Sequence, residues 1–192
     1  GMMNLNEMDE TVRAARGAGC KDLILLKCSS AYPSSPKESN ISSIPHMRKM
    51  FGCEVGLSDH TLGIGAAVGS VALGATVIEK HITLSRKDGG VDSTFSMEPE
   101  DMRALVAESK RAWESIGKIK YGPSKTEVLS RNYRRSLYIV KDIKKGQKIT
   151  IKNMRAIRPG LGLPTKYLND LVGKKVKRDI KKGTPVNWSI LE

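Results

Sequence analysis

The chain has 192 residues, of which 39% are hydrophobic and 28% are charged, a balance typical of globular proteins. No apolar run reaches the roughly 18 residues of a membrane-spanning helix, and no basic region precedes an apolar stretch at the start, so we expect neither membrane association nor a secretory signal. Three cysteines at unrelated spacings, Cys20, Cys28 and Cys53, form neither a CxxC pair nor a disulfide framework, which favours free thiols in a cytoplasmic protein.

The net charge of +13 comes entirely from the C-terminal segment. Residues 1–120 carry 15 Lys and Arg against 15 Asp and Glu, whereas residues 121–192 carry 18 against 5. Aromatic side chains that could stack on bases are sparse in the basic segment, and it contains no recognisable RNA- or DNA-binding motif. Anionic small molecules or an acidic partner surface explain this charge as well as nucleic acid does. We therefore do not expect a nucleic acid partner.

Residues 1–120 alternate between helical and strand patterns. The spacing of apolar residues predicts four helices, over 6–19, 41–51 (weaker, and interrupted at Pro45), 65–73 and 99–116. Short apolar runs predict three strands, over 22–28, 54–58 and 76–81. Helices that alternate with strands in this way are typical of a parallel α/β fold.

After Gly122 and Pro123 the composition becomes polar and basic, and a repeat follows. Lys-Asp-Ile-Lys-Lys-Gly-Gln-Lys-Ile at residues 141–149 recurs 37 residues later as Arg-Asp-Ile-Lys-Lys-Gly-Thr-Pro-Val at 178–186. Each copy is predicted to be a strand, a Lys-Lys-Gly turn and a second short strand. Two copies predict a compact pseudo-two-fold β domain, because a solenoid needs at least three. We expect the turn lysines to be solvated, with a binding face as the alternative.

Polar clusters follow all three predicted strands of the first segment, at residues 29–33, 58–61 and 79–92. Ligands bind at the carboxyl ends of the strands in parallel α/β folds and barrels, so these clusters predict one face of a single site. Glu79 and His81 are two residues apart and therefore share one side of a strand.

His60 and His81 are candidate ligands for a divalent metal ion. Two neutral imidazoles with carboxylate or substrate oxygens suit Mn²⁺ or Zn²⁺ and leave positions open for a substrate. The alternative is that each histidine is a hydrogen-bonded core residue. His46, in the weaker helix, is expected to be structural or at the surface. The residues alone predict a metal-assisted reaction of a small polar substrate, and no more.

The motifs carry a more specific signal. Gly-Leu-Ser-Asp-His-Thr at residues 56–61, Ile-Glu-Lys-His-Ile-Thr at 78–83 and Ile-Arg-Pro-Gly at 157–160 strongly resemble the sialic acid synthase family. Within that family, Leu-Ser-Arg-Lys-Asp-Gly-Gly-Val-Asp-Ser at 84–93 and Arg-Arg-Ser-Leu-Tyr at 134–138 are similar to the pseudaminic acid synthase branch. The resemblance covers essentially the whole chain.

The resemblance implies part of a TIM (β/α)₈ barrel over residues 1–120, a linker over 121–133, and a small β-clip SAF (antifreeze-like) domain over 134–192. A complete barrel has eight strands, and only three strand units are predicted here. We therefore expect a C-terminal part of a longer protein. Alone it should lack synthase activity, because the resemblance assigns the lysines that bind the phosphate of phosphoenolpyruvate to the preceding strands.

The resemblance also implies a reaction. Phosphoenolpyruvate would condense with an N-acetylated amino sugar, 2,4-diacetamido-2,4,6-trideoxy-altrose in the pseudaminic branch, giving a nine-carbon 2-keto sugar acid with C–O cleavage and release of phosphate. A divalent metal, Mn²⁺ first and Mg²⁺ or Co²⁺ as alternatives, would be held by His60 and His81 and polarise the sugar aldehyde. Glu79 would transfer protons beside it.

Further residues are implied to bind the two substrates. Ser30 and Ser58 would hydrogen-bond phosphoenolpyruvate, although the family often has Asn in place of Ser30. Tyr32 and Asp92 would hold sugar hydroxyls or N-acetyl groups. Simple turn roles for Ser58 and Tyr32, and a loop cap for Asp92, are the structural alternatives.

Two arginines of the basic segment complete the implied site. Arg158 would contact the sugar bound in the partner subunit's barrel, which implies a domain-exchanged homodimer; a purely structural turn is its alternative. Arg134 or Arg135 stands where sialic acid synthases carry an aromatic residue, which favours a different sugar. Two rival functions remain: an N-acetylneuraminate or legionaminate synthase, and a non-catalytic binding or assembly module built on the SAF domain.

Overall fold

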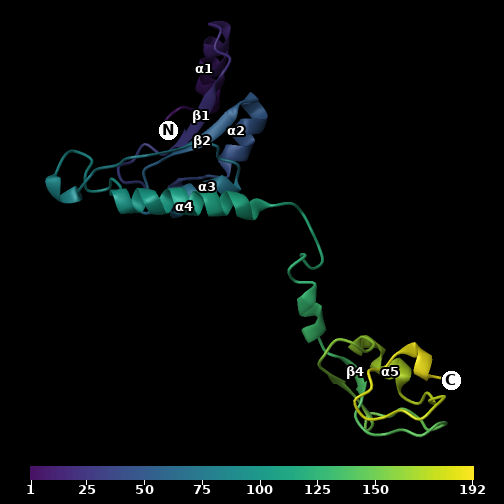
Figure 1. Ribbon diagram of the computed structural model, residues 1–192. Coiled ribbons are helices and arrows are strands. Elements are labelled where there is room, and N and C mark those ends of the chain that lie inside the picture. The colour runs from purple at the N-terminus through teal and green to yellow at the C-terminus, as the bar shows by residue number, and fades with distance from the viewer. The chain divides into compact units, whose positions relative to one another are not determined.

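The computed structural model describes all 192 residues, which form two compact units, residues 1–119 and 120–192 (Figure 1). None of the helices is both long and apolar enough to cross a membrane. Short 3-10 helices punctuate the loops of both units: η1 (Pro36–Glu38), η2 (Arg86–Asp88), η3 (Leu129–Tyr133), η4 (Thr165–Tyr167) and η5 (Trp188–Ile190).

The first unit is built on a three-stranded parallel sheet with the strand order β1-β2-β3. The strands are β1 (Ile24–Cys28), β2 (Glu54–Asp59) and β3 (Ile78–Lys80), and four helices alternate with them: α1 (Leu5–Gly17), α2 (Ser43–Phe51), α3 (Gly65–Ala72) and α4 (Pro99–Ile116). Cys28 pairs with Ser58, and Ser58 pairs with Glu79. The three strands therefore end nearly level with one another, which places the polar clusters at one edge.

Local chemistry explains where the helices begin. The Asn4 side chain accepts from the Glu7 N–H and the Glu7 carboxylate accepts from the Asn4 N–H, so a capping box starts α1. Pro99 stands at the start of α4, where its missing N–H is not needed. The predicted interruption at Pro45 is wrong for the same reason, because this proline lies in the first turn of α2.

The predicted strand over 76–81 is shorter than expected. The Thr76 N–H still donates to the Val55 carbonyl, but beyond Lys80 the chain turns away from β2, and the His81 carbonyl accepts instead from the Met97 N–H. At Gly56, in the middle of β2, an added Cβ would lie 2.3 Å from the Val77 carbonyl oxygen. The absence of a side chain there lets the chain leading into β3 approach β2 closely.

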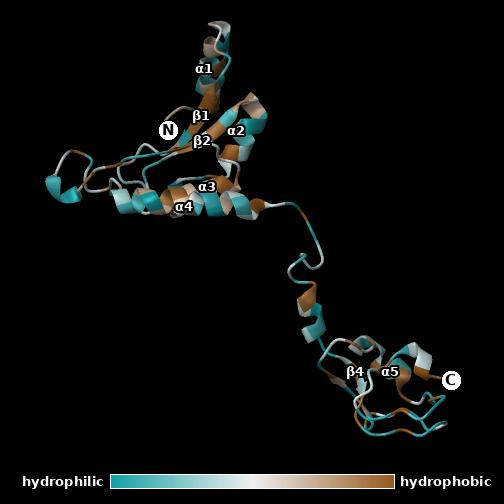
Figure 2. Cartoon of the chain, viewed as in Figure 1, coloured by the Kyte–Doolittle hydropathy of each residue, from teal (hydrophilic) through white to brown (hydrophobic).

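The core of the first unit lies between the sheet and its helices. Hydrophobic colouring is concentrated in β1 and β2 and in stripes along α4 (Figure 2). α3 packs along α4, as its small side chains allow. The buried cluster consists of Val12, Ile44, Met47, Phe51, Val55, Leu57, Ala67, Met97 and Leu105.

The second unit is a small β domain. β4 (Ser136–Ile139) pairs antiparallel with β5 (Met154–Ile157), and α5 (Leu168–Leu171) packs beside them. The segment expected to be a linker, residues 121–133, contains η3, whose Asn132 carbonyl accepts from the Gly160 N–H. The buried core consists of Leu137, Ile139, Ile143, Ile149, Met154, Leu171, Val176, Ile180, Val186 and Ile190.

The two copies of the repeat bind each other. Ile143 and Ile180 exchange both backbone hydrogen bonds, at N···O distances of 2.9 and 2.8 Å. The prediction of two strands within each copy is wrong, because the copies are joined by one isolated bridge, between Ile143 and Ile180, and the strands β4 and β5 lie elsewhere. The predicted exposure of the turn lysines is confirmed: the side chains of Lys144 and Lys181 are 73% and 81% exposed.

Candidate active site

His60 follows β2 and is oriented by the end of β1. Its residue is 7% exposed, and its Nδ1 lies 2.9 Å from the carbonyl oxygen of Ser29. A carbonyl only accepts, so this contact favours a proton on Nδ1. The lone pair of Nε2 is then left for another partner, which is the arrangement found for metal-binding histidines.

His81 follows β3 and lies next to His60. The two ring centroids are 5.1 Å apart, and Nδ1 of His81 is 3.5 Å from a carboxylate oxygen of Asp92. The structure therefore brings Asp92 to His81, as a neighbour that can orient the ring, while sequence reasoning assigned it to the sugar. Each imidazole has an oxygen beside Nδ1, so both Nε2 atoms remain for a ligand.

Two aromatic side chains lie beside the two imidazoles. The ring of Tyr32 is 4.3 Å from that of His60 and 5.9 Å from that of His81, measured between centroids. Phe95 lies 5.2 Å from His81 and 5.9 Å from Tyr32. Sequence reasoning missed Phe95. This residue could have been noticed in the sequence as a lone aromatic side chain in the polar loop that leads from β3 to α4.

Ser58 and Glu79 form a hydrogen-bonded pair on the same side of the sheet. They are cross-strand neighbours, and the Ser58 hydroxyl donates to Oε1 of Glu79 at 2.6 Å. Ser58 is buried, whereas Glu79 is exposed. The hydroxyl that sequence reasoning assigned to phosphoenolpyruvate thus holds the carboxylate that it assigned to proton transfer.

The other side of the same strand pair carries a buried ion pair between Asp59 and Lys80. Sequence reasoning did not find this pair. Ser30 lies further from the histidines. Its Oγ is 4.0 Å from Sγ of Cys28, which in turn is 3.9 Å from Nδ1 of His60.

The second unit holds the two remaining candidates. Arg134 and Arg158 are both exposed. Arg134 borders a hollow formed with η3 and Gly160, and Arg158 borders another formed with β5; Arg135 lines both hollows. These side chains form a basic surface that suits an anionic or polyhydroxylated ligand.

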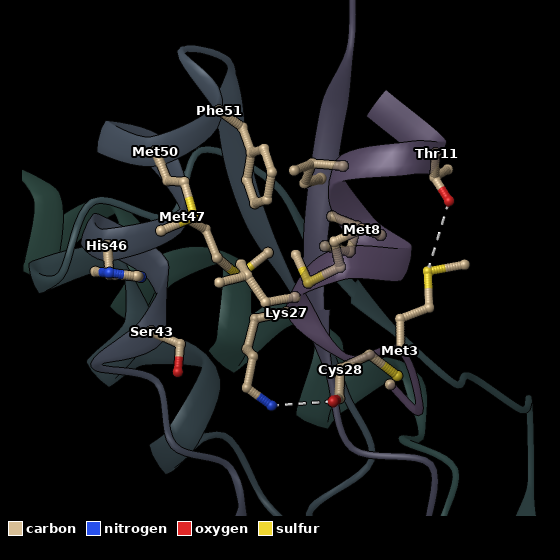
Figure 3. A pocket seen from close by; sticks show the side chains of 14 residues that line it. Met3, Met8, Thr11, Lys27, Cys28, Ser43, His46, Met47, Met50 and Phe51 are labelled. Carbon is tan, nitrogen blue, oxygen red and sulfur yellow. Dashed lines mark hydrogen bonds between the residues drawn. The ribbon is translucent and has the colours of Figure 1, made fainter. Parts of the chain in front are cut away.

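A separate pocket lies between α1, α2 and β1 (Figure 3). Its lining is rich in methionine and includes Met3, Met8, Met47 and Met50 together with Phe51. His46 is exposed at this pocket, as expected for a surface residue, and does not join the other two histidines.

The donor set fits a divalent cation in part. No group of three or more His, Cys, Asp or Glu side chains converges as a complete metal site. Two adjacent imidazoles with oriented Nδ1 atoms nevertheless match the half-site expected for a cation that completes its coordination with oxygen ligands. Residues His60 and His81 are thus suited to hold such an ion through Nε2.

Comparison with known proteins identifies the chain's relatives. Residues 1–121 match the NeuB family, and residues 134–192 match the SAF domain. The chain is 41% identical to a pseudaminic acid synthase of Campylobacter jejuni over 88% of this chain and 49% of that protein. It is 34% identical to the N,N'-diacetyllegionaminic acid synthase of Legionella pneumophila over 100% of this chain and 55% of that protein.

A solved structure agrees with these relatives. The N-acetylneuraminic acid synthetase of Leptospira borgpetersenii, in complex with citrate, has a TM-score of 0.61 and 33% identity over 70% of this chain and 47% of that one. The chain spans about half the length of the curated relatives it matches. The predicted fold, a parallel α/β region of barrel type followed by a small SAF domain, is confirmed. The chain therefore belongs to the NeuB family, which includes the sialic acid synthases that its motifs resemble.

Proposed function

We propose that this chain forms the metal- and sugar-binding part of a synthase that condenses phosphoenolpyruvate with an N-acetylated amino sugar. The observation that carries the proposal is the cluster at the carboxyl ends of adjacent parallel strands, where His60, His81 and Tyr32 lie beside the Ser58–Glu79 pair. Membership of the NeuB family supports it, because relatives of this chain include pseudaminic and legionaminic acid synthases.

A divalent cation belongs to this proposal, with Mn²⁺ first and Mg²⁺ or Co²⁺ as alternatives. Nε2 of His60 and Nε2 of His81 would hold it. When bound, such a cation supplies Lewis acidity toward a substrate oxygen. Asp92 and the Ser29 carbonyl would keep the two rings in orientation, and Tyr32 would cover one side of the His60 ring against water.

Glu79 is proposed to move the proton that the reaction requires. A carbon–carbon bond forms between C3 of phosphoenolpyruvate and C1 of the sugar, water adds at C2, and the C–O bond to phosphate breaks. The water gives up both of its protons: one ends on the aldehyde oxygen, which becomes a hydroxyl, and the other leaves with the phosphate as the C2 hydroxyl becomes a ketone. A single carboxylate can take up the first proton and deliver it to the aldehyde oxygen. Ser58 occupies Oε1 of Glu79, which leaves Oε2 for the exchange.

The sugar proposed is 2,4-diacetamido-2,4,6-trideoxy-altrose, and the product is pseudaminic acid. The support is the similarity of residues 84–93 and 134–138 to the pseudaminic branch, together with the 41% identity to the Campylobacter jejuni synthase. Arg134 or Arg135 would stand where the resemblance places an aromatic residue in sialic acid synthases. Arg158 is proposed to reach the sugar bound by the partner subunit of a domain-exchanged homodimer, while Ser30 contacts phosphoenolpyruvate.

Metal binding is tested on the chain itself by calorimetric titration with Mn²⁺. We expect one ion per chain, with binding lost in His60→Ala and in His81→Ala. If the chain binds no Mn²⁺ and neither substitution changes any property but stability, the non-catalytic SAF-based module becomes the better function.

Sugar specificity is tested with two chimeras. The part of the Campylobacter jejuni pseudaminic acid synthase outside the match is joined to this chain, and so is the corresponding part of the Legionella pneumophila legionaminic acid synthase. Phosphate release from phosphoenolpyruvate is measured with the diacetamido-altrose, with N-acetylmannosamine and with the legionaminic precursor. Both chimeras should prefer the altrose derivative. If each chimera instead prefers the sugar of the synthase that supplied its remaining part, the sugar is selected outside this chain.

A further inference from the structure

The buried ion pair between Asp59 and Lys80 lies directly behind the two candidate histidines. Asp59 ends β2 and Lys80 ends β3, and the two residues are paired in register. Nζ of Lys80 is 2.8 Å from Oδ2 of Asp59, and the two side chains are only 3% and 2% exposed. Ser58 and Glu79 occupy the opposite side of the same two strands.

The pair also binds the backbone of Thr61, the residue that follows His60. Oδ1 of Asp59 accepts the N–H of Thr61 at 2.9 Å, and Nζ of Lys80 donates to the Thr61 carbonyl oxygen at 2.5 Å. His60 stands between Asp59 and Thr61, and His81 follows Lys80 directly. The polar contacts of one ion pair therefore connect the backbone that carries the first imidazole to the backbone that carries the second.

Stability alone is a poor reason for this arrangement. Taking two charges out of water costs about as much as their attraction returns, and a buried pair is often replaced by apolar residues of similar volume without loss of stability. A buried pair with fixed hydrogen-bond partners can instead hold the backbone around it in a single geometry. The exposed ion pair between Arg48 and Glu54, at the start of β2, lies far along the strand from the histidines and lacks this burial.

We propose that the Asp59–Lys80 pair is a positioning device that sets the separation and orientation of His60 and His81. Neither residue contacts a ligand in this proposal; both act through the backbone of Thr61 and of the two histidines. The inference that the rings are positioned rests on the contacts above, and only its consequence for metal affinity rests on the proposed function. The loss of the pair should let the two imidazoles move apart while the fold persists.

The test is the double variant D59L/K80M in the full chain. It replaces both charges by apolar side chains of similar volume, so no charge is left buried without a partner. The first readout is the nuclear Overhauser effect between the ring protons of His60 and His81, in protein labelled at its three histidines. We expect this signal to be lost, with far-ultraviolet circular dichroism unchanged. An unchanged signal overturns the proposal.

The second readout is affinity for Co²⁺, followed by its visible absorption. Loss of groups that orient metal-binding histidines lowers affinity by roughly 10- to 100-fold, and the same is expected here. If the unaltered chain binds no Co²⁺, the metal-binding part of the proposed function fails, and the ring contacts still decide the positioning role. Equal affinity of the double variant and the unaltered chain counts against the positioning role.

A matched control and a milder variant complete the experiment. R48M/E54L removes the exposed ion pair from the other end of β2 and should leave both readouts unchanged. If D59L/K80M does not fold, D59N/K80M decides, because it also removes both charges while the amide keeps the shape of Asp59 and its hydrogen bond to Thr61. D59N/K80M should weaken the ring contact and Co²⁺ affinity; no change in either would overturn the proposal.

Discussion

Nδ1 of His60 lies 2.9 Å from the carbonyl oxygen of Ser29, so the imidazole that follows β2 is oriented by the end of β1. The same pattern recurs at His81, where Asp92 faces Nδ1. Two rings with their Nδ1 atoms engaged and their centroids 5.1 Å apart leave their Nε2 atoms for a ligand. The candidate site is thus formed by residues at the ends of three strands.

Asp92→Ala should weaken metal binding without destabilising the first unit. The carboxylate is half exposed and lies beside Nδ1 of His81, so its removal frees that ring to rotate. We expect Co²⁺ affinity to fall by about tenfold, the lower end of the effect seen for groups that orient metal-binding histidines. The matched control is Asp88→Ala in η2 of the same loop, which should leave affinity unchanged. Equal affinities in all three proteins would contradict the role of Asp92.

Glu79→Gln should abolish most of the condensation in the active chimera while leaving substrate binding intact. The amide keeps the shape of the side chain and still accepts from the Ser58 hydroxyl, but it cannot carry a proton. General acid–base groups contribute roughly 10²- to 10⁴-fold, so kcat should fall within that range with KM nearly constant. Ser58→Ala, which frees the carboxylate from its partner, should cost less. A Glu79→Gln chimera with unaltered kcat would remove Glu79 from the mechanism.

Much of this arrangement could be predicted from the sequence, because local sequence patterns indicate where the helices and strands lie. The helix over 99–116 has its acidic start and glycine stop in the sequence, and its bounds agree with α4. His60 and His81 directly follow β2 and β3, whose apolar runs the sequence predicts as strands, and Glu79 lies within the second of these strands. Sheet register, which pairs Ser58 with Glu79, was not predictable from either strand alone.

Contacts made across loops could not be predicted. Phe95 approaches His81 only because the loop after β3 returns to the sheet, where Met97 pairs with the backbone of His81 and Thr83. The Asp59–Lys80 pair was missed because alternation predicts only that each side chain faces the far side of its strand. Likewise, a repeat in the sequence indicates similar segments, but not that Ile143 and Ile180 bind each other. The roles assigned to Ser30, Tyr32, Arg134 and Arg158 stay predictions.

Gly56→Ala should destabilise the first unit, and Gly65→Ala should not. At Gly56 the new methyl group would lie 2.3 Å from the Val77 carbonyl oxygen, a backbone atom that cannot move without disturbing the β2–β3 pairing. Overpacking of this kind costs about 1–3 kcal/mol of unfolding free energy. Gly65 begins α3 with open space around it, so alanine there should be neutral or stabilise by about 0.5–1 kcal/mol. Urea unfolding followed by the fluorescence of Trp113 in a Trp188→Phe background measures both. Equal stability of the two variants would contradict the close approach.

The second unit should lose stability in acid through Asp142 and Asp179. The backbone N–H of Lys182 and the Lys181 side chain lower the pKa of the Asp142 carboxyl below its ordinary value of 3.8. In the same way, the backbone N–H of Lys145 and the Lys144 side chain lower the pKa of Asp179. A carboxyl with a lowered pKa in the folded state binds fewer protons there than in the unfolded chain.

The stabilisation from these two carboxylates is therefore fully present above their unfolded pKa and is lost as the pH falls through the lower, folded pKa. Thermal unfolding of the second unit, reported by Trp188 in a Trp113→Phe background, should show a falling Tm once the pH drops below about 4. D142N/D179N should lower Tm at neutral pH and flatten its dependence on pH in acid, because the amides keep their shape but cannot titrate. Asp170→Asn, at an exposed carboxylate of α5 outside these ion pairs, is the matched control and should follow the unaltered chain. A double variant with the same steep acid dependence as the unaltered chain would place that dependence elsewhere in the protein.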